Sequence, residues 1–188
     1  MGFIQAKSFE KEYEKMHASS IWQNKQGFRL DLFVKTICNA LDLTPTVARR
    51  AETFMTFNNL SIKMFSNEDV VLFKGITERP PDADDVSAII KASNINWNLV
   101  LDECILQSKK HAWHGALLNK LYEIKEKHGI TAPITKQLQK LYERTELLIW
   151  YNEKLTERKT HEHIIQELKK REFTKKEINQ LEEDIKNQ

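Results

Sequence analysis

Glycine and proline are scarce in this chain, and this constrains its fold most, because these residues supply most of the sharp turns in proteins. The 188 residues contain 5 Gly and 4 Pro, while 40% of the residues are hydrophobic and 30% are charged. Such a composition is far from that of a disordered chain and favours helices joined by short connections. We therefore expect an all-α protein of about nine helices, at least about 65% helical and without a sheet.

Apolar periodicity and capping residues divide the predicted helices into three parts. Residues 1–26 are expected to form a polar N-terminal helix that packs against the rest of the protein through a thin apolar stripe. Residues 27–110 are expected to form a first helical repeat and residues 111–188 a second, shorter one. The alternative is that the two repeats make one continuous domain.

Local signals mark several of these helices. Leu30–Leu41 carries apolar residues at i, i+3, i+4 and i+7, and Thr44–Pro45 caps and begins the next helix. Val70–Phe73 makes a short helix apolar nearly all round, which is typical of a helix buried at the centre of a fold. Further along, Gly129 ends one helix, and Thr174–Glu177 is a capping box that begins the last.

Two halves of the chain share one pattern of helices and caps. At a shift of 87 residues the aligned pairs include Leu30 with Leu117 and Thr44 with Thr131, and at a shift of 78 residues they include Val86 with Ile164. This pattern predicts an internal duplication. Chance similarity is the alternative, because any two amphipathic helical hairpins align in part.

Two stretches resemble parts of the cyclin fold as it occurs in the core domain of transcription factor IIB. Ile37–Ala51 is similar to that family's first helix, leucine-proline turn and second helix, and Pro81–Asn96 is similar to its fourth helix and the turn into its fifth. The resemblance implies two degenerate five-helix repeats that dock on the transcription machinery or on nucleic acid. The chain departs from the family because it has no four-ligand zinc ribbon. Its last helix also carries acidic residues that would repel phosphates: Glu177, Glu182, Glu183 and Asp184.

Basic residues collect in the second half of the chain. Residues 109–176 hold 16 basic and 9 acidic side chains, a local charge of +7 in a chain whose net charge is +2. Nucleic acid or an acidic protein surface is the expected partner of such a cluster, and a solvated lysine-rich turn is the alternative. The candidate contacts are Arg49, Arg50, Lys109, Lys110, Lys169, Lys170, Arg171, Lys175 and Lys176.

An apolar run in a charged helix suggests a second kind of site. Leu147–Tyr151 contains five consecutive apolar residues, which cover all sides of a helix and must be buried on several faces. The run is either part of the core or a surface for a partner, and in the second case Trp150 and Tyr151 are the predicted anchors. The alternative function is therefore a protein-protein adaptor or inhibitor with a helix-binding groove.

No linear motif indicates catalysis, a cofactor or a metal. Cys38 and Cys104 form no CxxC pair, and His111 and His114 lack further zinc ligands at suitable spacing. We expect a noncatalytic protein without cofactors, and an enzyme with a pocket inside a helical bundle is the third hypothesis. Because the sequence shows neither an apolar span nor a secretory signal, we expect a cytoplasmic or nuclear protein that is not bound to a membrane.

Overall fold

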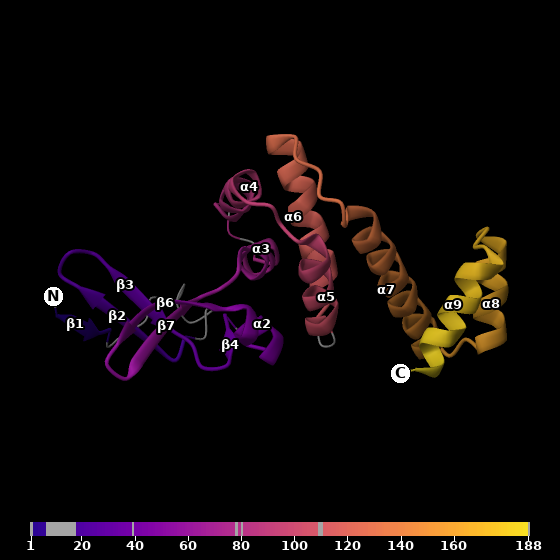
Figure 1. Ribbon diagram of the computed structural model, residues 1–188. Coiled ribbons are helices and arrows are strands. Elements are labelled where there is room, and N and C mark those ends of the chain that lie inside the picture. Colours follow the sequence, from indigo (N-terminus) through magenta and orange to yellow (C-terminus); the bar gives the residue numbers. More distant parts are fainter. Residues whose placement is uncertain are drawn as a thin grey trace.

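The structure is a computed structural model that describes residues 2–6, 18–38, 40–77, 79, 81–108 and 111–187. Within these ranges the protein has eight helices, which make up 57% of the described residues, and three small antiparallel sheets, which make up 16% of them. Strands lie at one end of the molecule, a group of helices occupies the centre, and the C-terminal helices project to the other end (Figure 1). The prediction of a helix-rich protein is confirmed, but the predictions of an all-α protein without a sheet and of at least about 65% helix are wrong for the described residues.

The strands of the described residues all lie in the N-terminal third of the chain. One sheet has the order β1-β2-β3, formed by β1 (Phe3–Gln5), β2 (Ser20–Asn24) and β3 (Arg29–Leu32). Two hairpins complete the set: β4 (Thr36–Ile37) with β5 (Leu41–Asp42), and β6 (Glu52–Phe57) with β7 (Leu60–Met64).

Strands replace the helix predicted over residues 1–26 wherever the structure describes it, and residues 7–17 lie outside the described residues. The turn between β2 and β3 explains the difference. The side-chain oxygen of Asn24 accepts hydrogen bonds from the backbone N–H groups of Gln26 and Phe28, at 3.0 and 2.9 Å. Asparagine commonly closes tight turns in this way, and the resulting hairpin interrupts the predicted helix.

The helix predicted over Leu30–Leu41 is likewise replaced, by β3, β4 and β5. The chain turns here at residues other than glycine. Lys35 and Cys38 have φ angles of +70° and +51°, a left-handed conformation that interrupts both helices and strands. Asn58, with φ of +45°, plays the same role between β6 and β7. The scarcity of glycine therefore does not mean a scarcity of turns in this protein.

The helix predicted after Thr44 forms but is short. In α2 (Pro45–Arg50), the hydroxyl of Thr44 accepts a hydrogen bond from the backbone N–H of Val47 at 3.2 Å, as the capping pattern predicts. The chain then enters β6, whose threonines and phenylalanines favour a strand. The stretch Ile37–Ala51 therefore contains β4, β5 and the short α2 instead of the two helices that the resemblance implies.

The helices predicted after residue 65 are confirmed. They are α3 (Asn67–Gly75), α4 (Asp82–Ala92), α5 (Trp97–Gln107), α6 (Trp113–His128), α7 (Thr135–Thr156), α8 (His161–Lys170) and α9 (Lys175–Lys186). Two of the predicted helix ends are confirmed as well. Gly129 ends α6 with φ of +69°, and Thr174 and Glu177 form both hydrogen bonds of a capping box at the start of α9.

Two hydrophobic clusters hold these helices together. The central cluster joins α3, α4, α5, α6 and the start of α7 to Leu41 of β5, and its fully buried residues include Leu72, Val86, Leu117 and Leu138. Within it α3 contacts α4, α5 and α6, which confirms α3 as the buried central helix. The second cluster joins the end of α7 to α8 and α9. Because the central cluster draws on residues before and after residue 110, the two predicted repeats share a core, and the predicted domain limits stay a prediction.

Among the described residues, no helix combines the length and the apolar character that crossing a bilayer requires.

Candidate functional site: an apolar groove beside a basic turn

A groove of about 620 Å³ lies along α7, between α5 on one side and α9 on the other. It forms because α7 extends beyond the central cluster before it meets α8 and α9, so apolar residues at the edges of the two clusters face the groove (Figure 1). Ile105 of α5, for example, is 44% exposed. The apolar residues that line the groove are Leu101, Ile105, Leu141, Leu147, Phe173 and Leu181.

An ion pair ties α7 to α9 at the edge of this groove. The guanidinium of Arg144 donates hydrogen bonds to both carboxylate oxygens of Asp184, and these bonds raise the pKa of Arg144. The side-chain amide of Gln180 also donates to Asp184, at 3.2 Å. Because Asp184 is nearly buried, this pair helps to fix the width of the groove.

Two lysines on the edge of the groove have no such partner. Lys140 lies on α7 and Lys176 lies in the first turn of α9, and both side chains are exposed. In the part of the chain that the structure describes, neither ammonium group forms a hydrogen bond or an ion pair. Both lysines are therefore available to a bound partner.

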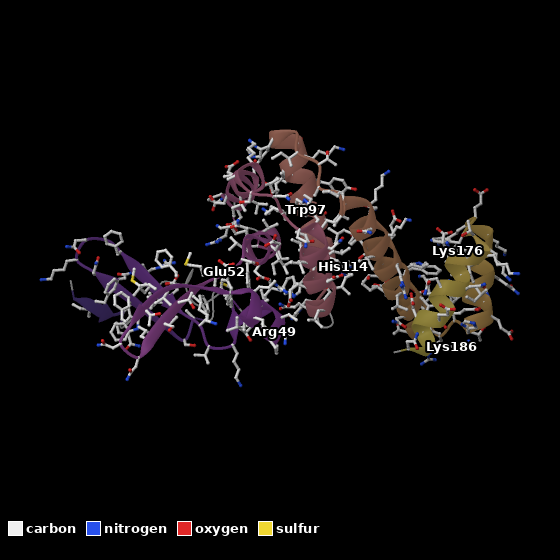
Figure 2. All side chains as sticks on the ribbon, in the orientation of Figure 1. Arg49, Glu52, Trp97, His114, Lys176 and Lys186 are labelled. Carbon is white, nitrogen blue, oxygen red and sulfur yellow. The ribbon has the colours of Figure 1, made fainter. Side chains whose placement is uncertain are left out.

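The predicted basic residues between 169 and 176 gather at the connection from α8 to α9, next to the groove (Figure 2). Arg171 is already engaged, because it forms an ion pair with Glu167 at 2.9 Å and lies 5.1 Å from the centre of the Trp150 ring. The four lysines of the turn are exposed and, within the described residues, unpaired: Lys169, Lys170, Lys175 and Lys176. We call these four residues the basic turn.

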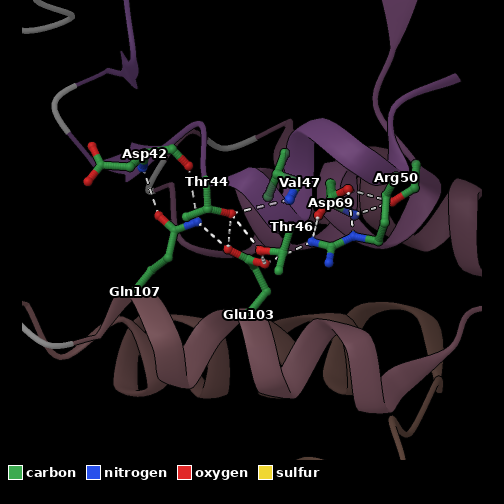
Figure 3. A network of polar contacts seen from close by, with 9 residues as sticks. Asp42, Thr44, Thr46, Val47, Arg50, Asp69, Glu103 and Gln107 are labelled. Atoms are coloured by element: carbon green, nitrogen blue, oxygen red, sulfur yellow. Dashed lines mark hydrogen bonds and ion pairs between the residues drawn. The ribbon is translucent and has the colours of Figure 1, made fainter. Parts of the chain in front are cut away.

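Arg50 is not available as a contact for nucleic acid, because it lies in an internal polar network (Figure 3). Its guanidinium pairs with Asp69 of α3 and, at 2.9 Å, with Glu103 of α5. Glu103 also accepts hydrogen bonds from the hydroxyls of Thr44 and Thr46, at 2.8 and 2.7 Å. The network joins α2 to α3 and α5, so the role of Arg50 is structural.

The hydrogen bonds of this network control the ionisation of Glu103. Desolvation alone would raise the pKa of this nearly buried carboxyl group. Hydrogen bonds from Thr46, Arg50, Gln107 and Thr44 outweigh the desolvation and hold its pKa below the ordinary value of 4.5. Glu103 is therefore a carboxylate at neutral pH, and its negative charge holds Arg50 in place.

The predicted anchors Trp150 and Tyr151 belong to the C-terminal core. Tyr151 is 3% exposed, and its hydroxyl forms a hydrogen bond of 2.8 Å with Nδ1 of His161. Trp150 is half-buried against the same cluster and lies under Arg171. The core alternative for the run Leu147–Tyr151 is therefore the correct one for Tyr151, which has no surface to offer a partner, and the role of Trp150 as an anchor stays a prediction.

The remaining predicted contacts do not join the groove. Arg49 is exposed on α2, in the N-terminal part of the molecule (Figure 2). Lys109 and Lys110 lie outside the described residues. Sequence reasoning missed the role of Ile105, although the apolar residues on several faces of α5 were a signal that this helix buries more than one side.

His114 and Cys104, two of the residues that could serve as metal ligands, have structural environments of their own. His114 is buried, and its Nε2 lies 3.0 Å from the hydroxyl of Thr145. Burial raises the pKa of the Cys104 thiol to about 12, so the thiol stays protonated at neutral pH. Among the described residues, no three His, Cys, Asp or Glu side chains lie close enough together to hold a metal ion.

Comparison with protein-family models, with curated proteins and with solved structures finds no match to this chain. The resemblance to the core of transcription factor IIB therefore stays a prediction. What the protein does must be inferred from the groove, the basic turn and the polar network themselves.

Proposed function

We propose that this protein is a noncatalytic adaptor that binds an amphipathic helix of a partner protein in the groove between α5, α7 and α9. The observation that carries the proposal is the apolar floor of the groove, which is open to solvent and bordered by charged residues. Grooves of this kind receive helices that present apolar residues at i, i+3, i+4 and i+7.

The dimensions of the groove suit such a partner. The α7 residues that line it run from Gln137 to Leu147, a rise of about 15 Å along the helix axis. About three turns of a partner helix cover the same length. Three turns carry about four apolar anchor residues, which is enough to fill the floor between Ile105 and Phe173.

Replacing Ile105 by Asp tests the groove without touching the core. We expect this variant to weaken the binding of an amphipathic helix at least about tenfold, because an aspartate would lie unpaired against the apolar face of the ligand. The probe is a 16-residue stapled peptide with a leucine stripe and uncharged flanking residues, and its dissociation constant is measured by fluorescence anisotropy.

Leu106 provides the matched control. It is the next residue of α5 and is 42% exposed, close to the 44% of Ile105, but it does not line the groove. Leu106→Asp should leave peptide binding unchanged, and both variants should keep the melting temperature of the parent protein. Equal weakening by the two substitutions, or no peptide binding by the parent protein, would contradict the proposed function.

A second candidate function is the binding of nucleic acid or of the transcription machinery through the basic turn. The observation that favours it is the exposure of four unpaired lysines on one short connection of the described chain. Such a surface would bind phosphates in a way that depends on charge and not on base sequence.

Replacing the four lysines of the basic turn by Ala tests this candidate. If they bind a phosphate backbone, the slope of log K against log salt should become shallower by about 0.9 for each phosphate that the variant no longer neutralises, for every DNA sequence alike. The control replaces four exposed lysines elsewhere, Lys63, Lys91, Lys125 and Lys136. The parent protein's failure to bind a 20-base-pair duplex at low salt would rule this candidate out.

A further inference from the structure

We infer that the helix bound in the groove is acidic, with Asp or Glu residues beside its apolar stripe. This inference rests on the proposed function and adds the chemical character of the partner. It follows from which charges around the groove are already satisfied within the protein and which are not.

Two of the carboxylates that line the groove are held firmly inside the chain. Asp184 is paired with Arg144. Glu177 accepts hydrogen bonds from the backbone N–H and the hydroxyl of Thr174, at 2.7 and 2.6 Å, and lies at the positive N-terminal end of α9. A cation on the partner would therefore compete with Arg144 for Asp184, whereas Glu177 keeps its second carboxylate oxygen, Oε1, without a hydrogen bond among the described residues.

The remaining carboxylate of the groove, Glu143, also has a partner inside the chain. It accepts a hydrogen bond from the side-chain amide of Gln139 at 2.7 Å, one turn earlier on α7. This bond leaves its charge without a cation. Glu143 and Glu177 together balance the charges of Lys140 and Lys176 in the groove lining, so the excess of positive charge comes from Lys169, Lys170 and Lys175 beside the groove.

Lys140 and Lys176 would not have to give up a contact within the described chain in order to bind a partner. Lys140 lies on α7 and Lys176 lies on α9, so a helix lying in the groove would have a lysine near it on two of the three helices that line the groove. In the described part of the chain neither lysine has a partner that would have to be displaced. The other residues of the basic turn, Lys169, Lys170 and Lys175, extend this positive charge past the end of the groove.

Each ion pair of this kind adds modest affinity. Together the pairs should give a strong preference for an acidic helix over a basic one. Exposed ion pairs contribute little individually, so two to four of them predict a gain of about threefold to tenfold over an uncharged helix. A basic helix would bring its own cations close to Lys140 and Lys176 and should bind more weakly than the uncharged one.

The test uses three stapled 16-residue peptides with the same leucine stripe and flanks of Glu, Gln or Lys, matched for helicity by circular dichroism. Their dissociation constants are measured against the full chain by fluorescence anisotropy at about 0.05 and 0.5 M salt. We expect the order Glu tighter than Gln tighter than Lys at low salt, and a smaller spread at high salt, where the charges are screened.

Charge reversal in the protein gives the second arm. The double variant Lys140→Glu with Lys176→Glu should reverse the order of the Glu and Lys peptides and leave the Gln peptide unchanged. The control is Lys136→Glu with Lys186→Glu, which makes the same charge change on exposed residues of α7 and α9 outside the groove. This control variant should bind the three peptides in the same order of affinity as the parent protein.

The outcomes separate this inference from the proposed function. If all three peptides bind equally and Ile105→Asp still weakens them, the adaptor function stands and the acidic partner is overturned. If no peptide binds, both fail together. A third outcome is that a 20-base-pair DNA duplex binds more tightly than the Glu peptide. If Lys140→Glu with Lys176→Glu then weakens duplex binding and Ile105→Asp does not change it, the lysines bind phosphates and the inference is overturned.

Discussion

Replacing Arg50 by Met is expected to lower the free energy of unfolding by about 3 kcal/mol. The substitution removes the cation that Asp69 and Glu103 share, and these side chains are 1% and 3% exposed. Two buried carboxylates without a cation are strongly unfavourable, and removing one member of a buried ion pair typically costs about 3–5 kcal/mol. We take the lower end because the Arg50 side chain is itself 20% exposed. Urea denaturation measures the effect.

Arg49 offers a matched control because it is the neighbouring arginine of the same helix and is exposed. Arg49→Met should change the stability by no more than about 0.5 kcal/mol. A similar loss in both variants would show that the effect comes from α2 itself, and a negligible loss in both would mean that the network does not stabilise the fold.

The pH dependence of stability gives an independent check on the same network. The pKa of Glu103 is lower in the folded protein than its ordinary value of 4.5, so its contribution is fully present above about pH 4.5. As the pH falls below this value, the unfolded chain takes up the proton first, and the contribution is lost through the folded pKa. The Arg50→Met variant, which lacks one of the bonds that lower this pKa, should lose less stability over this range than the parent.

Signals that lie within a few residues of one another predicted the second half of the fold. Thr174 and Glu177 form the capping box as expected, and Gly129 ends α6. Because these features depend only on residues a few positions apart, the residue types predict them well. The exposure of the basic turn followed in the same way, because it lies on a short connection between two predicted helices.

The strands and the groove depend on contacts that no local pattern contains. Lys35 and Cys38 adopt left-handed conformations although neither is glycine, so the turns around β4 could not be seen in the residue types. Arg49 and Arg50 are adjacent arginines with different roles. Only Arg50 forms ion pairs with Asp69 of α3 and Glu103 of α5, and no local pattern predicts these contacts. The groove likewise requires α5 and α9 to lie on two sides of α7.

Comparing Leu72→Ala with Leu60→Ala tests whether the β6–β7 hairpin contributes to the core. Leu72 lies in α3 and is 1% exposed, so its replacement by Ala should leave a cavity and lower the free energy of unfolding by about 3 kcal/mol. Leu60 lies in β7 and is 61% exposed, and the same substitution there should change the stability by no more than about 0.5 kcal/mol. Chemical denaturation of both variants provides the comparison. Equal losses would mean that the β6–β7 hairpin is buried in solution and that the core extends to this hairpin. A large loss at Leu72 alone would locate the stability of the protein in the packing of α3 against α4, α5 and α6.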